Sequence, residues 1–300
     1  MPSLPDRTSL TKSTLIDRVA RVDLRVRDVE AALSFYRDVV GLEVVERDDT
    51  RALLGAPGGP VFLSLRSTGV TMPADPRATG LFHVAIRFPT RSALGDVLAR
   101  VSAAGYQMGA GDHLVSEALY VDDPDGNGVE LYWDRPVEQW PPPTEDMVVP
   151  MATLPVDLRA VLNEGRGRAA VGDKAPARTE VGHVHLQVSD IGPTTRFYAE
   201  QLGLDLIARL GNQASFFSSN GYHHHIGANT WRSLNGRPSS RESAGLDRVT
   251  FAVGDADRLE GLRLRLGDLA GKTSDDGAVI VVDPDEIELQ FAVAGAAAPD

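Results

Sequence analysis

The sequence predicts an α+β fold of four βαβββ modules that pair into two mixed-sheet domains. Residues 21–46 and 183–208 share one pattern, an alternating apolar strand followed by an amphipathic helix and a second strand. Two further segments repeat the strand and helix order, and each is followed by a strand that closes its sheet: 80–106 and 245–271, closed by 126–133 and 285–291. Each module has too few elements for an independent core, so the modules should pair.

Each helix of the first pair of repeats has a recognisable beginning and end. Asp28 and Asp190 directly precede the helical stretches, where an aspartate side chain accepts from free backbone N–H groups. Both stretches stop at a glycine, Gly41 or Gly203, the residue type that most readily takes the left-handed conformation after a helix. Aromatic pairs within the stretches are expected in the core: Phe35-Tyr36 and Phe197-Tyr198.

The modules begin near residues 18, 80, 181 and 245. A proline run and a polar Gly/Ala/Arg stretch separate modules two and three and are typical of a linker, with one short helix expected around 155–163. The chain is therefore predicted to contain an N-terminal tail (1–16), a first domain with modules one and two (17–140), a linker (141–179) and a second domain with modules three and four (180–295).

Composition excludes several kinds of partner. The chain has 300 residues with 42 acidic and 30 basic side chains, a formal charge of −12, and this acidic balance argues against nucleic acid. The N-terminus lacks the apolar core of a signal peptide, and no apolar run approaches the ~20 residues of a membrane span. We therefore expect a soluble, cytoplasmic protein with no membrane partner.

The chain has no cysteine, so any metal must be held by His, Asp or Glu. Seven histidines are present, and all of them lie in modules two and three: His83, His113, His183, His185, His223, His224 and His225. This clustering predicts a functional site formed by the two central modules.

Four stretches carry a resemblance to the vicinal oxygen chelate superfamily, which includes glyoxalases, bleomycin resistance proteins and extradiol dioxygenases. They are GLFHVAIRFP, GDHLVSEALYVDDPDGNGVELYWDRP, GHVHLQVSD with the following RFYAEQLGL, and NGYHHHIGANTW. The chain most resembles bacterial two-domain catechol-2,3-dioxygenase-type proteins. The resemblance implies glyoxalase-like, cup-shaped sheets with a metal between paired modules. In ring-cleaving members, two histidines and one carboxylate hold Fe(II) and leave positions open for the diol and O2.

The resemblance implies one ligand position on each first strand and a carboxylate on the last strand. The first-strand positions are Arg21, His83, His183 and Arg248, and carboxylates are offered by Glu130 and Glu288. If modules one and two pair, and three and four pair, each cup has an incomplete ligand set. If module two pairs with module three, His83, Glu130 and His183 complete the metal site in one cup. Glu288 is then interpreted as a relic or a member of a salt bridge.

The same resemblance assigns roles to residues around the metal. His224, in NGYHHH, matches a catalytic acid/base, whereas Tyr120 and His113 match groups that hydrogen-bond the chelated oxygen and the intermediate. His185 shares a strand face with His183, and we expect it to line the ring pocket with Phe216. On a regular strand His224 would face away from its two neighbours, so alternation alone does not choose which of the three histidines faces the metal.

The sequence thus predicts an Fe(II)-dependent extradiol dioxygenase of aromatic catabolism, with Mn(II) as the other metal considered. Its partners would be a catechol-type diol, O2 and further copies of the chain in a homo-oligomer. Two other functions use the same scaffold. A glyoxalase-like isomerase or lyase would use Ni, Co or Zn with four protein ligands, and a drug-resistance-type protein would bind a small molecule without catalysis.

Overall fold

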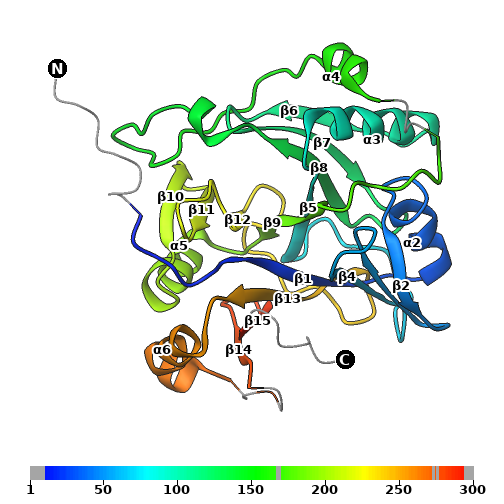
Figure 1. Ribbon diagram of the computed structural model, residues 1–300. Helices are drawn as coiled ribbons and strands as arrows, with labels where there is room; N and C mark the ends of the chain where they lie inside the picture. Colours follow the sequence, from blue (N-terminus) through cyan, green and yellow to red (C-terminus); the bar gives the residue numbers. More distant parts are fainter. Residues whose placement is uncertain (1–10, 167–169, 272–273, 275–276, 294–300) are drawn as a thin grey trace.

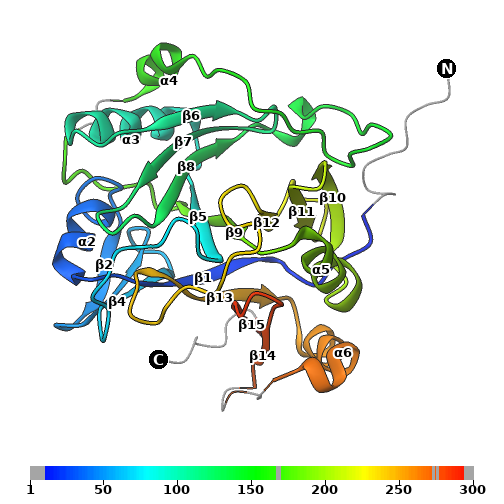
Figure 2. The ribbon, with the colours of Figure 1, turned by 180° about the vertical axis from the view of Figure 1, so that it is seen from behind.

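The structure, a computed structural model, describes residues 11–166, 170–271, 274 and 277–293. The predicted tail at 1–16, linker at 141–179 and second domain ending at 295 lie partly outside this range. Two curled mixed sheets form the molecule, and β1 and β13 of one sheet run below β5 and β9 of the other in both views (Figures 1 and 2).

The eight-stranded sheet combines modules two and three. Its strands are, in spatial order, β10 (Asp205–Leu210), β11 (Ala214–Ser218), β12 (Ile226–Asn229), β9 (Glu180–Gln187), β5 (Gly80–Arg87), β8 (Gly128–Asp134), β7 (Ser116–Asp122) and β6 (Gly109–Asp112). The first strands of the two modules, β5 and β9, pair antiparallel at its centre.

The seven-stranded sheet combines modules one and four. Its strands are, in spatial order, β14 (Val279–Val282), β15 (Glu288–Val293), β13 (Gly245–Val253), β1 (Arg18–Arg25), β4 (Val61–Arg66), β3 (Arg51–Gly55) and β2 (Glu43–Arg47). Here too the first strands of the modules, β1 and β13, pair antiparallel. Within the described residues, two strands follow the helix of module four, compared with three in each of the other modules.

The strand pairing shows which modules share a sheet: module two pairs with module three, and module one with module four. The predicted four-module α+β architecture is confirmed, and the first strands begin close to the expected residues. We expected segments 17–140 and 180–295 to form one domain each. Each sheet instead takes one module from each segment, so neither sheet lies within one of them. The boundaries of these segments as domains stay a prediction.

One helix follows the first strand of each module, and a fifth lies in the linker. They are α2 (Val29–Tyr36), α3 (Arg91–Ala103), α4 (Leu158–Glu164), α5 (Ile191–Thr195), which continues into a π-helical turn over Arg196–Gln201, and α6 (Ala256–Leu266). Asp28 and Asp190 cap α2 and α5 by accepting from Ala31 N–H and Gly192 N–H, as predicted. Gly41 and Gly203 have φ of +93° and +80°, the left-handed conformation expected of them.

Contacts between helices and turns connect the two sheets. The Tyr36 hydroxyl of α2 donates to Asp123, which lies in the turn before β8, at 3.0 Å. The equivalent contact in the other half joins Tyr198 to Asp283 at 2.9 Å. All four side chains are buried. Modules that are neighbours in the sequence therefore remain packed on each other although their strands belong to different sheets.

The linker forms part of the wall of the eight-stranded sheet. Val148 N–H donates to Ile207 O on edge strand β10, and Leu154 exchanges backbone hydrogen bonds with Asp112 on the opposite edge strand, β6. The chain then forms α4, close to the predicted helix at 155–163, and α4 packs on α3 (Figure 1). The linker thus spans the open side of the curled sheet.

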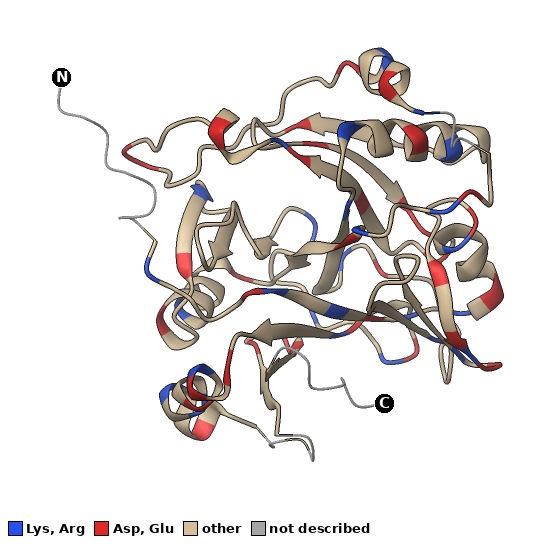
Figure 3. Cartoon of the chain, viewed as in Figure 1, with Lys and Arg blue, Asp and Glu red and all other residues tan. Residues whose placement is uncertain are grey.

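Three of the described helices, α3, α4 and α6, carry charges of both signs. Figure 3 shows acidic and basic residues intermixed along α3, α4 and α6. The longest described helix, α3, has 13 residues. In the part of the chain that the structure describes, no helix has the length and apolarity needed to cross a membrane.

Candidate metal centre and active site

A cavity of about 650 Å³ lies between the eight-stranded sheet and the linker. Its lining includes every site residue that the sequence predicted: His83, His113, Tyr120, Glu130, His183, His185, Phe216 and His224. Residues of modules two and three and of the linker all contribute to it. The structure therefore brings the eight predicted residues together in one place.

Strand register sets the three proposed metal ligands side by side. Ala85, at the centre of β5, pairs with Glu130 on β8 and with His183 on β9. His83 lies two residues before Ala85 and so shares its face of the sheet. The side chain of Ala85 is a single methyl group, which leaves the carboxylate and the imidazole room to meet above it.

The ligand atoms of this cluster converge. Nε2 of His83 lies 2.8 Å from Oε2 of Glu130, and Nε2 of His183 lies 3.0 Å from the same oxygen. One ligand atom from each residue lies within 4.8 Å of the other two. All three side chains are buried, so these atoms meet inside the protein and not on its surface.

The charge states of the cluster suit a divalent metal. Burial would raise the pKa of Glu130, but His183 and His83 outweigh it and hold that pKa well below its usual range. Burial lowers the pKa of His183 to about 4, so its imidazole is neutral at pH 7. Nδ1 of His183 has no hydrogen-bond partner among the described residues. Two imidazoles and one carboxylate fit a two-His, one-carboxylate metal site.

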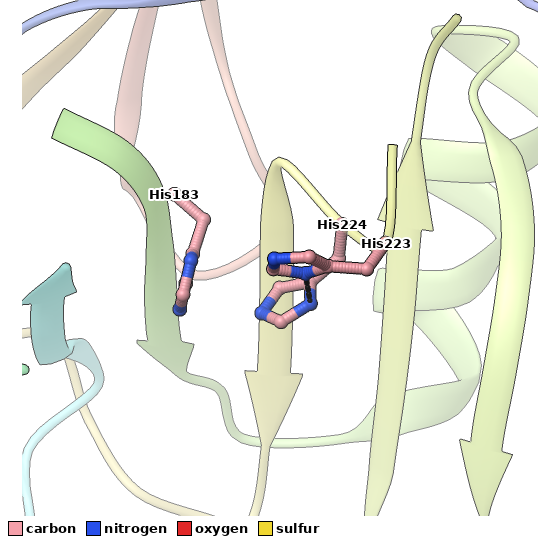
Figure 4. A group of neighbouring side chains, drawn as sticks. All are labelled: His183, His223 and His224. Carbon is pink, nitrogen blue, oxygen red and sulfur yellow. Dashed lines mark hydrogen bonds between the residues drawn. The ribbon is translucent and has the colours of Figure 1, made fainter. Parts of the chain in front are cut away.

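A second set of histidines lies beside the first. His183, His223 and His224 also offer ligand atoms within 4.8 Å of one another (Figure 4). The ring of His224 lies 4.1 Å from that of His183, measured between centroids. Nδ1 of His224 lies 2.9 Å from Nδ1 of His223, the contact that Figure 4 marks with a dashed line.

The histidine triplet does not form part of a strand. Residues 223–225 form an irregular bend before β12, so the alternation expected of a regular strand does not apply to them. His223 and His224 both face His183, whereas Nδ1 of His225 accepts from the backbone N–H of Ser219 at 3.3 Å. The bend thus turns two histidines of the triplet toward His183, of which His224 lines the cavity, and turns the third toward Ser219.

Tyr120 and His113 form a hydrogen-bonded pair that the linker orients. The carbonyl of Ala152 can only accept, so Nδ1–H of His113 donates to it at 2.8 Å. Nε2 of His113 is then an acceptor, and the hydroxyl of Tyr120 donates to it at 2.6 Å. Burial and the neighbouring Glu130 raise the pKa of Tyr120 well above its usual value, so the phenol keeps its proton.

His185 and Phe216 form an aromatic wall. The ring of His185 lies 5.6 Å from that of Phe216 and 5.0 Å from that of His83. Burial lowers the pKa of His185 well below its usual value, so this ring is neutral. A Cβ at Gly227 on β12 would lie 3.0 Å from the His185 ring, which explains a glycine at that position.

Strand register corrects one assignment made from the sequence. In the eight-stranded sheet Ala85 pairs with Glu130, and at the equivalent place in the seven-stranded sheet Thr250 pairs with Gln290. The counterpart of Glu130 is therefore Gln290 and not Glu288. Glu288 forms an ion pair with Arg248, in line with the expected salt bridge.

Sequence reasoning missed three further residues at or near the cavity, Met147, Met151 and Asp134, and left open whether His223 faces the metal. Met147 and Met151 of the linker line its wall, and Asp134 and His223 form a hydrogen-bonded pair behind His224 at 2.9 Å. The position of Asp134, four residues after Glu130, was the one available sequence signal. The two methionines gave none, because their linker has no periodic pattern.

Comparison with known proteins identifies the family. The family model of the Glyoxalase/Bleomycin resistance protein/Dioxygenase superfamily matches residues 16–131. The chain is 39% identical over 256 residues to a catechol-2,3-dioxygenase of Bacillus subtilis (strain 168), covering 84% of this chain and 87% of that protein. It is 31% identical over 135 residues to biphenyl-2,3-diol 1,2-dioxygenase 3 of Rhodococcus globerulus, covering 41% of this chain and 66% of that protein.

Solved structures show the same fold at low sequence identity. One from Bacillus subtilis subsp. subtilis str. 168 has a TM-score of 0.65 at 14% identity, covering 94% of this chain and 87% of that chain. A glyoxalase I mutant from Zea mays has a TM-score of 0.54 at 16% identity, covering 92% of each chain. Together with the 39% identity over most of both sequences, these findings show that the chain belongs to the glyoxalase/bleomycin resistance protein/dioxygenase superfamily.

Proposed function

We propose that the protein is an Fe(II)-dependent extradiol dioxygenase that cleaves a catechol-type aromatic ring with O2. The observation that carries this proposal is the convergence of His83, His183 and Glu130 inside a cavity that also contains His224 and Tyr120. The relatives named as ring dioxygenases support the reaction class.

His83, His183 and Glu130 would hold the metal. Fe(II) held there would supply binding sites for the diol and O2, and its charge would favour the ionised diol. The ligand set contributes a single negative charge, because both imidazoles are neutral donors. Mn(II) accepts the same set of donors.

Three other side chains would act on the diol. His224 lies against His183, where a neutral imidazole can take the proton of the second hydroxyl. The hydroxyl of Tyr120 lines the same cavity, where its oxygen can accept a hydrogen bond from a hydroxyl of the diol. His113 accepts from that phenol and is itself held by Ala152, so the linker fixes the direction of the Tyr120 hydroxyl.

The remaining cavity would receive the aromatic ring and its substituents. Phe216, His185, Met147 and Met151 give it an apolar lining. Its volume of about 650 Å³ falls in the ~300–1,000 Å³ range of sites for drug-sized ligands. A catechol with a bulky substituent, such as an aryl group, therefore fits this cavity better than catechol itself.

The number of carboxylates available as metal ligands favours ring cleavage over a glyoxalase-like isomerisation. Glyoxalase-like isomerases often use two carboxylate ligands. Among described residues that line the cavity, the carboxylates are Glu130 and Asp122, and Asp122 belongs to neither group of possible ligands. Its side chain is exposed at the end of β7.

The test uses protein purified without a histidine tag and loaded with Fe(II) under anaerobic conditions. We expect one iron per chain, and O2 uptake with loss of the aromatic absorbance when catechol or biphenyl-2,3-diol is added, with the higher kcat/KM for the larger diol. Stoichiometric nickel, cobalt or zinc in protein as isolated would favour an isomerase, and no metal would favour a binding protein. Iron-loaded protein that takes up no O2 with any diol would refute the proposal.

A further inference from the structure

The proposed function makes no use of His223, although this histidine is fully buried directly behind His224. His223 contributes to the second histidine group and lies against His224 (Figure 4). On its other side it contacts Asp134, the last residue of β8. The three side chains form a continuous chain of hydrogen bonds that leads from the core to the cavity.

The hydrogen bonds specify which nitrogens carry protons. Oδ1 of Asp134 can only accept, so Nε2–H of His223 donates to it at 2.9 Å. In a neutral imidazole the other nitrogen, Nδ1 of His223, is then an acceptor. Its partner at 2.9 Å is Nδ1 of His224, which must donate its hydrogen. His224 is left with an unprotonated Nε2, the nitrogen on the opposite side of its ring.

Asp134 is held so that Oδ1 remains available to His223. The hydroxyl of Tyr222 and a guanidinium N–H of Arg87 donate to the other oxygen, Oδ2, at 2.9 and 3.0 Å. Burial would raise the pKa of Asp134, but His223 and Arg87 outweigh it and the net effect is a lowered pKa. Arg87 supplies a cation to this carboxylate at 3.0 Å, so the ion pair of Asp134 does not require a second positive charge.

Packing prevents the ring of His223 from turning over. The Tyr222 ring lies 4.1 Å and the Trp140 ring 5.5 Å from it, measured between centroids. Behind Tyr222, the hydroxyl of Tyr132 is 2.8 Å from that of Tyr222, and a Cβ at Gly182 would overlap the Tyr132 hydroxyl. This arrangement fixes both the position and the orientation of the imidazole.

We propose that Asp134 and His223 are positioning residues that hold His224 as the Nδ1–H tautomer, with the lone pair of Nε2 available to the cavity. This inference rests on the proposed role of His224 as the group that takes the diol proton. In that step the O–H bond of the second hydroxyl breaks and an N–H bond forms at Nε2. The positive charge on His224 is then stabilised through His223 by the Asp134 carboxylate.

The test replaces Asp134 by asparagine. Tyr222 and Arg87 would bind the amide oxygen and leave the NH2 group facing His223, so His223 would accept at Nε2 and donate from Nδ1. His224 would then carry its proton on Nε2 and could not accept one from the diol. For Asp134→Asn we expect kcat to fall about 100-fold, the scale of a lost proton transfer, with KM and iron content changed less than about threefold.

The control is His225→Gln, which alters the adjacent histidine. His225 is equally buried but bonds to the backbone of Ser219 and is not a lining residue of the cavity, so kcat should stay within about threefold of wild type. If Asp134→Asn and His225→Gln reduce kcat equally, the effect is structural and the proposed positioning role is wrong.

A spectroscopic measurement separates this inference from the proposed function. In ¹⁵N NMR spectra of labelled protein loaded with Zn²⁺, we expect His224 to be protonated at Nδ1 and His223 at Nε2. In Asp134→Asn the proton of each ring should move to its other nitrogen. Comparison with His224→Gln identifies the signals of His224. His224 protonated at Nε2 in wild-type protein would overturn the inference. An iron-loaded protein that cleaves no diol but has the expected tautomers would overturn the proposed function alone.

Discussion

Replacing Glu130 by glutamine tests whether the cluster on the eight-stranded sheet binds the metal. Glu130 is the anionic member of a group whose other members are His83 and His183. Removal of partners that merely orient metal ligands already costs 10–100-fold in affinity, so loss of the anionic ligand itself should cost at least ~100-fold. The amide is similar in size to the carboxylate, which keeps the packing of the site.

The size of the effect follows from ligand linkage. At a metal concentration 100 times the Kd of the wild type, binding stabilises the fold by about 2.7 kcal/mol. A 100-fold weaker site is half occupied at that concentration, and the stabilisation falls to about 0.4 kcal/mol. For a chain of this length these values correspond to rises in Tm of about 5 °C and about 1 °C.

The assay is the difference in Tm with and without metal, measured for each variant. Because each variant is compared with its own metal-free form, effects of the substitution on folding cancel. Glu288→Gln is the matched control: its partner Arg248 is half-buried, and such a pair contributes less than about 1 kcal/mol. If Glu288→Gln loses the metal-dependent rise and Glu130→Gln keeps it, the metal binds elsewhere and the reasoning fails.

Three further predictions concern the cavity and the contacts between modules. Ala85→Val would place two methyl groups between His183 and Glu130, so iron affinity should fall at least ~10-fold by titration; unchanged affinity would contradict the spacer role of Ala85. Tyr198→Phe leaves Oδ2 of buried Asp283 without its donor, whereas Oδ1 keeps the N–H groups of Asp285 and Ile287; the free energy of urea unfolding should fall by about 1–2 kcal/mol while kcat is unchanged. Burial raises the pKa of Asp283 from 3.8 to about 6, so the stability it contributes is full below pH 3.8 and is lost as the pH rises through about 6. Asp283→Asn should therefore flatten the fall in stability between about pH 4 and 7, and a variant with the wild-type slope would show that another group titrates.

Features that depend on neighbouring residues in the chain, such as the beginnings of helices, could be predicted from the sequence. An aspartate before an amphipathic stretch predicts the beginning of a helix because its side chain acts on the next turn of the same chain, and Asp28 and Asp190 both do so. The cluster of His83, Glu130 and His183 followed from the resemblance to the vicinal oxygen chelate superfamily, which implies ligands on first strands and on a last strand. The pairing of β5 with β8 and β9 brings these positions together.

Features that depend on contacts between distant segments could not be predicted in this way. The bend at 223–225 arises where the chain leaves β11 to enter β12, and it turns His223 toward Asp134, which is 89 residues away. Only the register of β13 with β15 shows that Gln290 is the counterpart of Glu130. In the sequence, the short motif around Glu288 resembles the motif around Glu130 more closely. A linker sequence without periodicity likewise gave no sign that Met147 and Met151 face a cavity.

The two sheets share one architecture but differ at the place where a metal would bind. In the seven-stranded sheet the positions of His83, His183 and Glu130 are taken by Arg21, Arg248 and Gln290. Guanidinium groups remain protonated and donate no lone pair, so two arginines repel a divalent ion instead of binding it. Among the described residues, both groups that could hold a metal lie in the eight-stranded sheet and the bend before β12.

The two arginines form ion pairs at strand positions that correspond to those where the histidines would bind a metal. Arg21 lies 2.8 Å from Asp23, and Arg248 pairs with Glu288 and donates to Gln290 at 3.2 Å. Such pairs need no cofactor, so the seven-stranded sheet can fold and support the molecule whether or not metal is present. The pairing of module two with module three thus places both candidate metal-binding groups in the eight-stranded sheet and the bend before β12, while the seven-stranded sheet folds on ion pairs. Removal of a metal should therefore lower the stability without unfolding the chain.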